Sequence, residues 1–355
     1  MEHFVYEDRA RLRDFVDLDV VRYAHGLSLL GTMQGHVEDY FDHPKLQQIV
    51  QYSLVFLGGA PNNTPALYNL MSHVDFNLGV YYPEDGMGGV VDGVVAMAEE
   101  LGVTFHTDHP VAEIRGQEGG FVVRTEDGRE FFPDEVVSDA DYAHTEQELL
   151  VPEDRQYDAD YWDSRTYAPS AFLLYLGVEG DVDPLAHHTL VLPTDWDDHF
   201  DTIFGDDPEW PEDPAYYLCV PSETDDTVAP EGHSNLFALV PIAPGLADGP
   251  ERREAFRDLL LDDIAEHTGV DIRDRIVFEE SFCVSEFADR YNSTQGTALG
   301  LAHTLRQTSL LRPPHASTEV DGLYFTGSYT TPGIGVPMCL ISGKLTAERM
   351  AKTRR

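Results

Sequence analysis

Apolar positions recur at helical spacing through most of the first 75 residues, which predicts amphipathic helices there. The pattern is clearest over Val20–Leu30 and Leu46–Leu57. Glycine, proline and asparagine interrupt the second of these at residues 58–63, and Thr64-Pro65 restarts a helix toward Met71. This region is therefore expected to contribute helices rather than strands.

A compact block of mixed helix and strand patterns follows. Residues Gly79–Tyr82 have the pattern of a short strand, and a helix from Val90 is expected to stop at Gly102, because glycine favours a helix end. Further short strands are predicted at Val103–Phe105, Val111–Arg115, Phe121–Thr125, Glu130–Phe132 and Val136–Ser138. Units of this kind are typical of mixed α/β folds.

The composition changes between about Thr145 and Asp289, where apolar strands alternate with loops rich in proline and aspartate. The predicted strands are Ala171–Leu176, Tyr216–Val220 and Leu236–Ile242, and one long helix runs from Pro250 to His267, ending at Gly269. We interpret this region as a sheet-based lobe inserted between two parts of the first lobe.

The last strand, turn and helix carry the strongest local signal. An apolar strand ends at Gly327, Pro332-Gly333 lies in the loop, and a helix begins near Val336 with Pro337 in its first turn. Glycine lets the backbone approach a ligand closely, and the free N–H groups of a helix start favour a negative or electron-rich group. Two interpretations stay open: a well-capped turn, or a loop that holds the flavin end of FAD.

The charge balance is strongly acidic, since 23 basic and 64 acidic residues among 355 give a net charge of −41. Nucleic-acid binding is not expected, because the chain has no basic stripe. Either the surface is adapted to concentrated salt, which screens its self-repulsion, or an acidic patch binds a cationic partner. The first interpretation is favoured because the carboxylates are spread along the chain.

Few residues form metal-ligating or nucleophilic patterns. Cys219, Cys283 and Cys339 are far apart in apolar contexts, which indicates buried free thiols in a reducing cytoplasm. His187 and His188 are neighbours, but adjacent strand residues point to opposite faces, so a structural role is favoured and no metal is expected. No signal-peptide pattern is found, and no apolar run approaches the about 18 residues that span a bilayer.

Several motifs in combination resemble the carotenoid desaturase family, the phytoene desaturases of bacteria and archaea. In chain order they are residues 43–46 (His-Pro-Lys-Leu), 58–61 (Gly-Gly-Ala-Pro), 79–83 (Gly-Val-Tyr-Tyr-Pro) with 86–88 (Gly-Met-Gly), 138–141 (Ser-Asp-Ala-Asp) with 144–145 (His-Thr), 185–189 (Leu-Ala-His-His-Thr), 229–232 (Ala-Pro-Glu-Gly), 312–313 (Arg-Pro) and 331–337 (Thr-Pro-Gly-Ile-Gly-Val-Pro). The similarity covers essentially the whole chain, and the acidic bias resembles haloarchaeal members. Asp139 stands where the family usually has asparagine.

The resemblance implies an α/β (α+β) fold with a flavin-containing amine-oxidase-like architecture: a partial FAD-binding Rossmann-like domain and an inserted sheet-based substrate domain. Residues 1–75 would form the helical part of the substrate or membrane-facing domain. Residues 76–145 and 291–355 would be the middle and C-terminal parts of the FAD-binding domain, and residues 146–290 the substrate domain.

The resemblance also implies an FAD-dependent oxidoreductase acting on CH–CH bonds, which desaturates a long polyene by hydride transfer to the flavin and loss of a proton. Asp42 and His43 are the candidate acid–base residues, with a solvated loop as the alternative. The implied cofactor-binding residues are Val111, beside the adenine, and Gly327, Ser328, Pro332, Gly333, Gly335, Val336, Pro337 and Met338, at the flavin.

The hydrophobic carotenoid substrate implies a cytoplasmic protein in peripheral contact with the membrane surface. We expect an apolar rim that includes the segment Val50–Leu57 to make this contact.

The glycine fingerprint that cradles the FAD pyrophosphate in this family is not found in the sequence. The chain is therefore expected to be N-terminally truncated and to bind FAD poorly by itself. Beside a phytoene desaturase, two alternatives stay open: a related flavoenzyme, such as a carotenoid 3,4-desaturase or a carotene isomerase, and an inactive remnant or subunit.

The acidic surface predicts that the chain unfolds when it is diluted into low salt. Screening between like charges weakens as the Debye length grows from about 3 Å at 1 M to about 10 Å at 0.1 M. Circular dichroism across a KCl series measures this, and the melting temperature should fall with each dilution. An unchanged melting temperature between molar and decimolar salt would favour a cationic partner instead.

Overall fold

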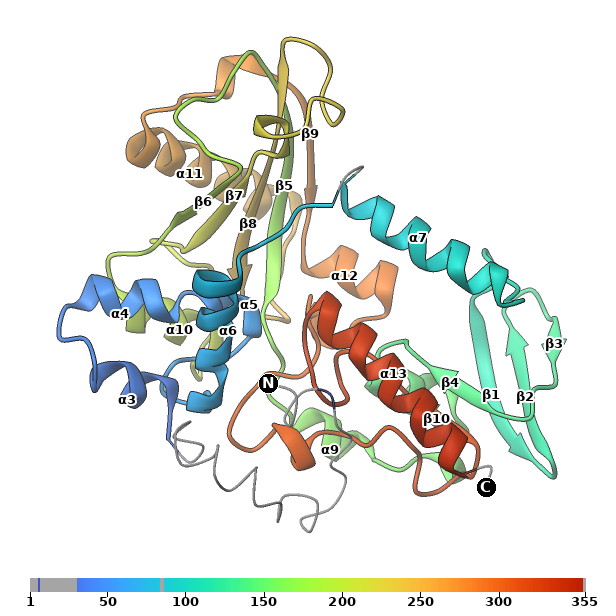
Figure 1. Cartoon of the computed structure of the whole chain (residues 1–355). Helices are drawn as coiled ribbons and strands as arrows, with labels where there is room; N and C mark the ends of the chain where they lie inside the picture. The colour runs from blue at the N-terminus through green and yellow to red at the C-terminus, as the bar shows by residue number, and fades with distance from the viewer. Residues whose placement is uncertain (1–5, 7–30, 84–85, 354–355) are drawn as a thin grey trace. The chain divides into compact units, whose positions relative to one another are not determined.

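The computed structural model describes residue 6, residues 31–83 and residues 86–353 (Figure 1). The chain divides into two compact units. The first unit comprises Met1–Leu78, Thr107–Pro169 and Ala288–Arg355, and the second comprises Gly79–His106 and Ser170–Phe287. The predicted helix at Val20–Leu30 lies outside the described residues.

These units differ from the predicted segments in two places. Residues 79–106 group with the sheet-based unit, and residues 146–169 group with the first unit together with the N-terminal helices. The return to the first unit at residue 288 lies close to the predicted boundary at 290. Which unit carries the cofactor and which the substrate stays a prediction.

Two helices of the first unit, Met33–Glu38 and Pro44–Gln51, begin at side-chain caps. The Thr32 hydroxyl accepts the Gly35 N–H at 3.2 Å, and His43 Nδ1 accepts the Lys45 N–H at 3.2 Å. The predicted break at Gly58 is confirmed, since this residue ends α5 in the left-handed conformation. The helices are α3 (Met33–Glu38), α4 (Pro44–Gln51), α5 (Ser53–Leu57), α6 (Asn69–His73), α8 (Tyr142–His144), α9 (Ala159–Asp163) and α13 (Val336–Thr353), with shorter helical turns between them.

Two small sheets complete the first unit. An antiparallel sheet joins β1 (Val111–Gln117), β2 (Gly120–Thr125) and β3 (Glu130–Phe131), and a parallel pair joins β4 (Val136–Ser138) to β10 (Leu323–Phe325). The pair brings together strands that are far apart in sequence. It places the end of β10, where the glycine-rich loop begins, beside the end of β4.

Two predicted strands are wrong. Gly79–Tyr82 and Val103–Phe105 are irregular in the structure, and neither pairs with another described strand. Val80 and Tyr81 are 66% and 87% exposed. Valine and tyrosine fit a strand locally, but a strand also needs a neighbour for its backbone hydrogen bonds and a surface against which to pack.

An aromatic core supports the β10 end of the first unit. The rings of Tyr142 and Phe325 stack at 3.7 Å between centroids, and Trp162 packs beside Tyr142 at 5.5 Å. Leu323 and Tyr329 belong to the same buried cluster. The strand that leads into the glycine-rich loop and Tyr329 within the loop are therefore anchored in one core.

The second unit is built on a five-stranded antiparallel sheet with the order β6-β7-β8-β5-β9. Every second residue of β5 faces the core, where Phe172, Leu174, Leu176 and Val178 are buried against the inner side of α11. The strands are β5 (Ser170–Glu179), β6 (His188–Val191), β7 (Tyr216–Cys219), β8 (His233–Ile242) and β9 (Ile276–Phe282), and the helices are α7 (Gly86–Glu100), α10 (Trp196–Phe204), α11 (Pro250–Thr268) and α12 (Val284–Tyr291), which crosses the unit boundary.

The sequence predicted most of these elements. The long helix α11 ends at Gly269 as expected, and α7 begins at Gly86, four residues before the predicted start at Val90. Cys283 is buried, whereas Cys219 and Cys339 are half-buried, and all three thiols are free. Within the part of the chain that the structure describes, no helix combines the length and apolarity needed to cross a bilayer.

One buried carboxylate of the first unit is surrounded by donors. Glu146 accepts the N–H groups of Gln156 and Tyr157 and the indole N–H of Trp162 at 3.1 to 3.2 Å. Burial raises the pKa of Glu146 to about 7, although these donors and Arg155 oppose the shift. The side chain ties the 156–157 loop and α9 to the aromatic core.

The free energy of unfolding should therefore carry a pH dependence from Glu146. Because its folded pKa lies above the unfolded value, the folded state binds more protons, and this contribution is lost as pH rises through about 7. Between pH 6 and 8 the loss is about 1 kcal/mol. Denaturant unfolding in molar KCl should show this extra slope in the natural chain relative to Glu146→Gln. The exposed Glu153→Gln variant is the control and should keep the slope; equal slopes in all three proteins contradict the assignment.

Candidate functional site

The glycine-rich loop at residues 326–335 is pinned at its start by α13. Ser342, which is fully buried, accepts the Gly327 N–H at 3.0 Å through its hydroxyl. The same hydroxyl lies 3.0 Å from Thr326 Oγ1 and 2.7 Å from Thr330 Oγ1. The helix that follows the loop therefore fixes where the loop leaves the strand.

The buried guanidinium of Arg312 binds the backbone of the loop at residues 328 and 329. Arg312 donates to the carbonyls of Ser328 at 2.5 Å and Tyr329 at 3.2 Å, and to those of Gln307 and Leu301 at 3.1 Å. Burial lowers the pKa of Arg312 to about 10, so the group stays charged at neutral pH. The loop therefore lies over a fixed positive charge.

His303 fixes the second half of the loop. Its Nε2 accepts the Ile334 N–H at 3.1 Å, which leaves the ring proton on Nδ1, hydrogen bonded to the Tyr68 hydroxyl. That hydroxyl lies 3.0 Å from Thr308 Oγ1. Burial and the charge of Arg312 hold the pKa of His303 well below its usual range, so the ring is neutral.

Gly333 is the point of closest packing in the loop. Its φ of +119° favours glycine, and a Cβ there would lie 2.1 Å from His303 Cε1. Gly335 has a similar φ of +116°, but its Cβ would meet only Met338 Cγ at 3.8 Å. Packing therefore requires glycine at residue 333, whereas the space beside residue 335 is open.

The outward edge of the loop is open. Gly335, Val336 and Pro337 are exposed, and Val336 is 56% exposed. The Gly335 carbonyl accepts the Cys339 N–H at 2.8 Å and so opens α13. The first-turn N–H groups of a helix have no acceptor within the helix, and Pro337 contributes none. Ser328, Pro332 and Met338 are half-buried.

The glycine-rich loop and the start of α13 together fit a flavin. The loop offers glycine backbone without Cβ obstruction at residue 335, a helix start and a positive charge beneath, all of which suit an electron-rich ring edge. Asp139 lies at the same place, because a Cβ on Gly327 would approach its Oδ1 to 2.5 Å. The carboxylate at this position, where asparagine was expected, therefore borders the loop.

The remaining predicted site residues lie elsewhere in the first unit. Val111 begins β1 and packs against the core cluster that contains Leu323 and Phe325. Asp42 and His43 are exposed at the start of α4, which His43 caps. Among the described residues, no hydrogen bond or ion pair joins any of these three to the loop, so their roles stay predictions.

Sequence reasoning missed the residues that position the loop. Arg312 was visible only as part of an Arg-Pro motif, and His303 and Ser342 carried no signal. Their partners lie up to 235 residues away in the chain, so local patterns could not reveal them.

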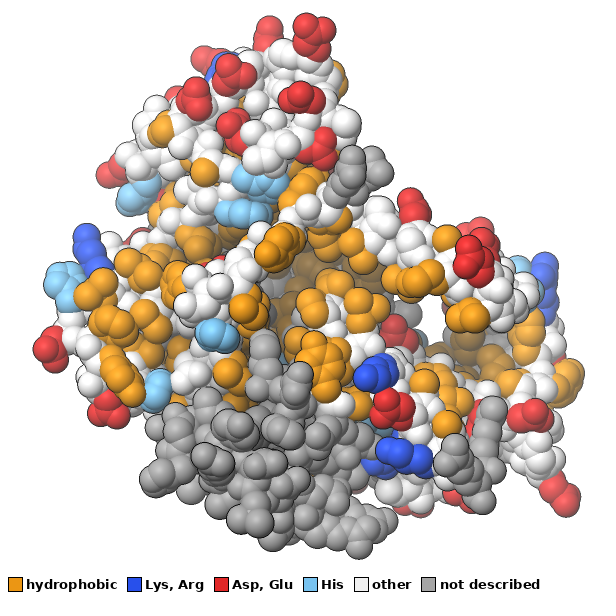
Figure 2. All heavy atoms as spheres, in the orientation of Figure 1, with side chains coloured by type: hydrophobic (Ala, Val, Ile, Leu, Met, Phe, Trp, Pro, Cys, Tyr) orange, Lys and Arg blue, Asp and Glu red, His pale blue; other side chains and the backbone are white. Residues whose placement is uncertain are grey.

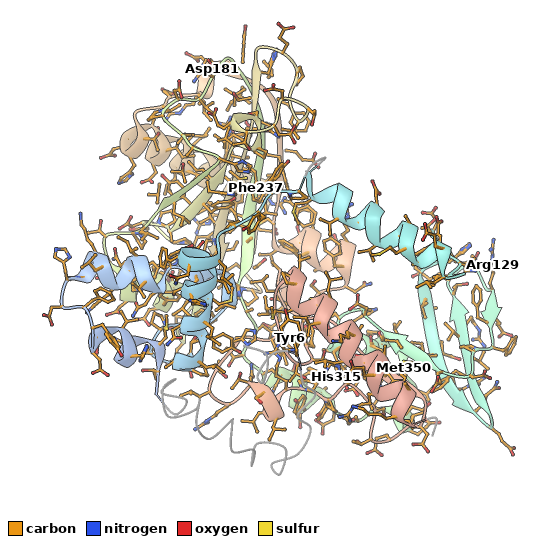
Figure 3. The ribbon with its side chains drawn as sticks, viewed as in Figure 1. Tyr6, Arg129, Asp181, Phe237, His315 and Met350 are labelled. Atoms are coloured by element: carbon orange, nitrogen blue, oxygen red, sulfur yellow. The ribbon has the colours of Figure 1, made fainter. Side chains whose placement is uncertain are left out.

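The second unit offers an aromatic sheet face opposite its core. The strand register places Tyr175 of β5 opposite Phe237 of β8, and Tyr217 of β7 lies on the same face. The Tyr175 and Phe237 rings are 5.1 Å apart, and those of Tyr217 and Phe237 are 6.4 Å apart. Figure 3 labels Phe237 on β8. It also labels His315 of the first unit, near α13, whose ring is hydrogen bonded to Thr331 and Thr346.

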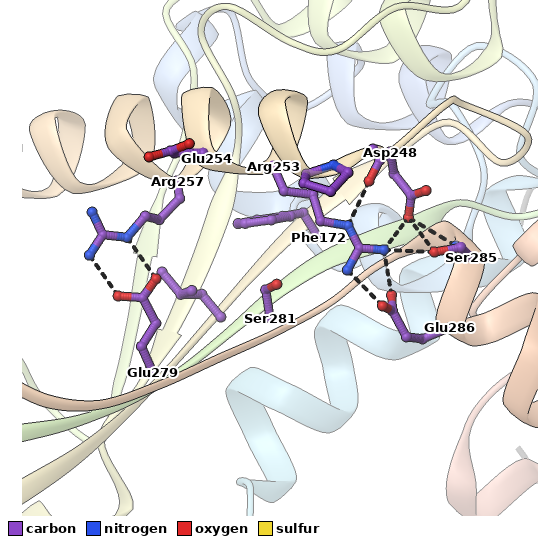
Figure 4. A pocket seen from close by; sticks show the side chains of 12 residues that line it. Phe172, Asp248, Arg253, Glu254, Arg257, Glu279, Ser281, Ser285 and Glu286 are labelled. Atoms are coloured by element: carbon purple, nitrogen blue, oxygen red, sulfur yellow. Dashed lines mark hydrogen bonds and ion pairs between the residues drawn. The ribbon is translucent and has the colours of Figure 1, made fainter.

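A pocket of about 830 Å³ in the second unit is lined by charged side chains, unlike the aromatic sheet face (Figure 4). Arg253 is paired there with Asp248 and Glu286, both at 2.6 Å, and Arg257 is paired with Glu279 at 2.6 Å. These paired charges make the lining polar. The pocket is therefore unsuited to an apolar polyene.

Comparisons with known proteins identify the family to which the chain is similar. A family model described as "Flavin containing amine oxidoreductase" matches residues 8–351. The chain is 70% identical over 351 residues to the carotenoid 3,4-desaturase of Haloarcula japonica, covering 99% of this chain and 71% of that protein. It is 30% identical to the zeta-carotene-forming phytoene desaturase of Myxococcus xanthus, with 99% and 68% coverage. The expected resemblance to carotenoid desaturases is confirmed.

Solved structures confirm the expected fold. An oxidoreductase from Methanosarcina mazei matches with a TM-score of 0.60 at 17% identity, over 95% of this chain and 75% of that chain. A mutant of putrescine oxidase (A394C) matches with a TM-score of 0.59 at 13% identity, over 98% and 72% of the two chains.

Gly333→Ala should destabilise the chain more than Gly335→Ala. Both changes place a Cβ at a positive φ, but only the first drives it against His303, an added cost of about 1 to 3 kcal/mol. Urea unfolding in molar KCl measures the difference. The added cost should shrink when Gly333→Ala is made together with His303→Ala. An equal loss of unfolding free energy in the two glycine variants would show that the positive φ, and not the contact with His303, causes the destabilisation.

Proposed function

Because the chain belongs to the flavin containing amine oxidoreductase family, we propose that it is an FAD-dependent carotenoid desaturase, an oxidoreductase that introduces C=C bonds into a long polyene. The observation that carries the proposal is the 70% identity to a carotenoid 3,4-desaturase over 99% of the chain. Identity to the phytoene desaturase of Myxococcus xanthus is only 30%. This favours 3,4-desaturation, one of the open alternatives, over phytoene desaturation, the first expectation.

The flavin would be held by the glycine-rich loop and the start of α13. We assign this role to Gly327, Ser328, Pro332, Gly333, Gly335, Val336, Pro337 and Met338, with Val111 near the adenine. The bound flavin supplies the acceptor for a hydride from a substrate carbon. The protein contributes backbone N–H groups, a rigid loop and the Arg312 charge, all of which are in place before the substrate binds.

The polyene would lie against apolar surface. The aromatic face formed by Tyr175, Phe237 and Tyr217 offers flat rings on three neighbouring strands. Such a wall would contact a long conjugated chain through flat apolar rings, without directional hydrogen bonds.

Two substrates distinguish the possible reactions. Flavin-loaded protein in molar KCl is given vesicles that contain either phytoene or a carotenoid with a long conjugated chain. We expect the second to lose two hydrogens per new bond and to absorb at longer wavelength, with phytoene unchanged. Conversion of phytoene alone would restore the first expectation. A flavin-loaded sample that changes neither substrate would favour an inactive subunit, and geometric change without hydrogen loss would indicate an isomerase.

His43→Asn separates proton transfer from helix capping. Asparagine is also a good N-cap, so α4 should keep its stability, whereas His43→Ala removes the cap. If His43 or Asp42 transfers the proton, His43→Asn or Asp42→Asn lowers kcat about 100-fold or more without changing the melting temperature. Activity within twofold of the natural chain in both variants would assign His43 to capping alone.

The membrane contact that we propose needs a different surface from the predicted one. In the segment Val50–Leu57, Leu54 is 0%, Val55 9% and Leu57 5% exposed, so this segment is core and the rim assignment was wrong. Tyr40, Leu46 and Ile49 are instead 72%, 46% and 47% exposed. Hydrophobic side chains gather over α3 and α4 in Figure 2, among acidic residues spread across the visible face.

Leu46→Asp combined with Ile49→Asp should weaken vesicle binding. Contact between an acidic protein and a lipid surface relies on buried apolar area, which this change removes. Co-sedimentation with vesicles in molar KCl measures binding, and the melting temperature should stay the same. Phe132→Asp, at a residue that is 67% exposed and directly follows β3, is the control. Equal loss in the control would show that no particular surface binds the membrane.

A further inference from the structure

A cluster of metal-ligating side chains lies at one edge of the five-stranded sheet, apart from the residues assigned to the flavin. β6 is an edge strand, and its first residue, His188, lies directly opposite Cys219 of β7. Directly opposed residues in an antiparallel pair project from the same face of the sheet. His187 immediately precedes β6.

The two histidine rings lie side by side, with centroids 4.3 Å apart. The expectation that they point to opposite faces is wrong, because His187 precedes the strand and does not follow its alternation. One ring nitrogen from each histidine and Cys219 Sγ all lie within 4.8 Å of one another. Ligands of a tetrahedral zinc ion are about 3.3 to 3.6 Å apart, so small side-chain rotations close the site.

Neighbouring hydroxyl groups orient both rings. His187 Nδ1 lies 2.6 Å from Thr224 Oγ1, and His188 Nδ1 lies 2.6 Å from the Tyr217 hydroxyl. His187 Nε2 is buried and has no hydrogen-bond partner among the described residues. A ligating histidine characteristically uses one nitrogen for the metal and the other for such a hydrogen bond. The Tyr82 ring packs edge-on against the His187 ring, with centroids 4.9 Å apart.

We propose that His187, His188 and Cys219 bind a divalent transition metal of the zinc class. Two imidazoles and one thiolate form a borderline-soft donor set that suits Zn²⁺ and disfavours Mg²⁺ and Ca²⁺. The metal would join β6 to β7 at the sheet edge and leave its fourth position to water or an added ligand. Binding requires the thiolate, so the Cys219 proton is released to solvent as the Sγ–metal bond forms.

Cobalt is the probe that reports the thiolate directly. The full chain, stripped with a chelator and kept in molar KCl, is titrated with Co²⁺ in a large excess of Mg²⁺, which occupies surface carboxylates. One equivalent should give the near-ultraviolet thiolate-to-cobalt charge-transfer band together with tetrahedral visible bands, and Zn²⁺ should remove both. Zn²⁺ should also raise the melting temperature.

Matched variants decide the assignment. Cys219→Ser should abolish the charge-transfer band, and His187→Gln should weaken Co²⁺ binding at least tenfold. Cys339→Ser, at another half-buried free cysteine, and His267→Gln, at an exposed histidine, should bind Co²⁺ as the natural chain does. A natural chain that is folded by circular dichroism but shows no thiolate band overturns the proposal. So does a band that survives in Cys219→Ser or disappears in Cys339→Ser.

Discussion

The backbone of the glycine-rich loop is largely buried on its inner side, so its polar groups must find partners within the protein. An unsatisfied buried carbonyl or N–H costs about as much as a lost hydrogen bond, and several would unfold the loop. Arg312 satisfies two loop carbonyls, His303 satisfies the Ile334 N–H and Ser342 satisfies the Gly327 N–H. These partners hold the inner edge of the loop to the protein, whereas Gly335, Val336 and Pro337 at the outer edge are exposed.

This constraint explains what the sequence predicted and what it did not. The strand, the loop and the start of α13 near Val336 follow from local rules about apolar runs, glycine and proline. The residues that hold the loop follow from tertiary contacts. Tyr68 and His303 are 235 residues apart, and the sequence around one of them does not predict its contact with the other.

The errors in secondary structure have a related origin. Gly79–Tyr82 has strand-like residues but no described neighbour with which to pair, and pairing is a property of the whole fold. The two histidines were misjudged because His187 precedes β6, so the alternation of faces along a strand does not apply to it. The long, strongly patterned elements, such as α11 and β8, were predicted to within a few residues.

The burial of Arg312 separates the loop electrostatically from the rest of this acidic protein. A chain with a net charge of −41 carries a surface potential that rises and falls with the ionic strength around it. Dissolved ions cannot gather around a guanidinium that is 5% exposed, so its field at the loop is nearly independent of salt. A change in the salt concentration around the protein would thus alter its solubility and stability while leaving the contribution of Arg312 to the potential at the loop almost constant.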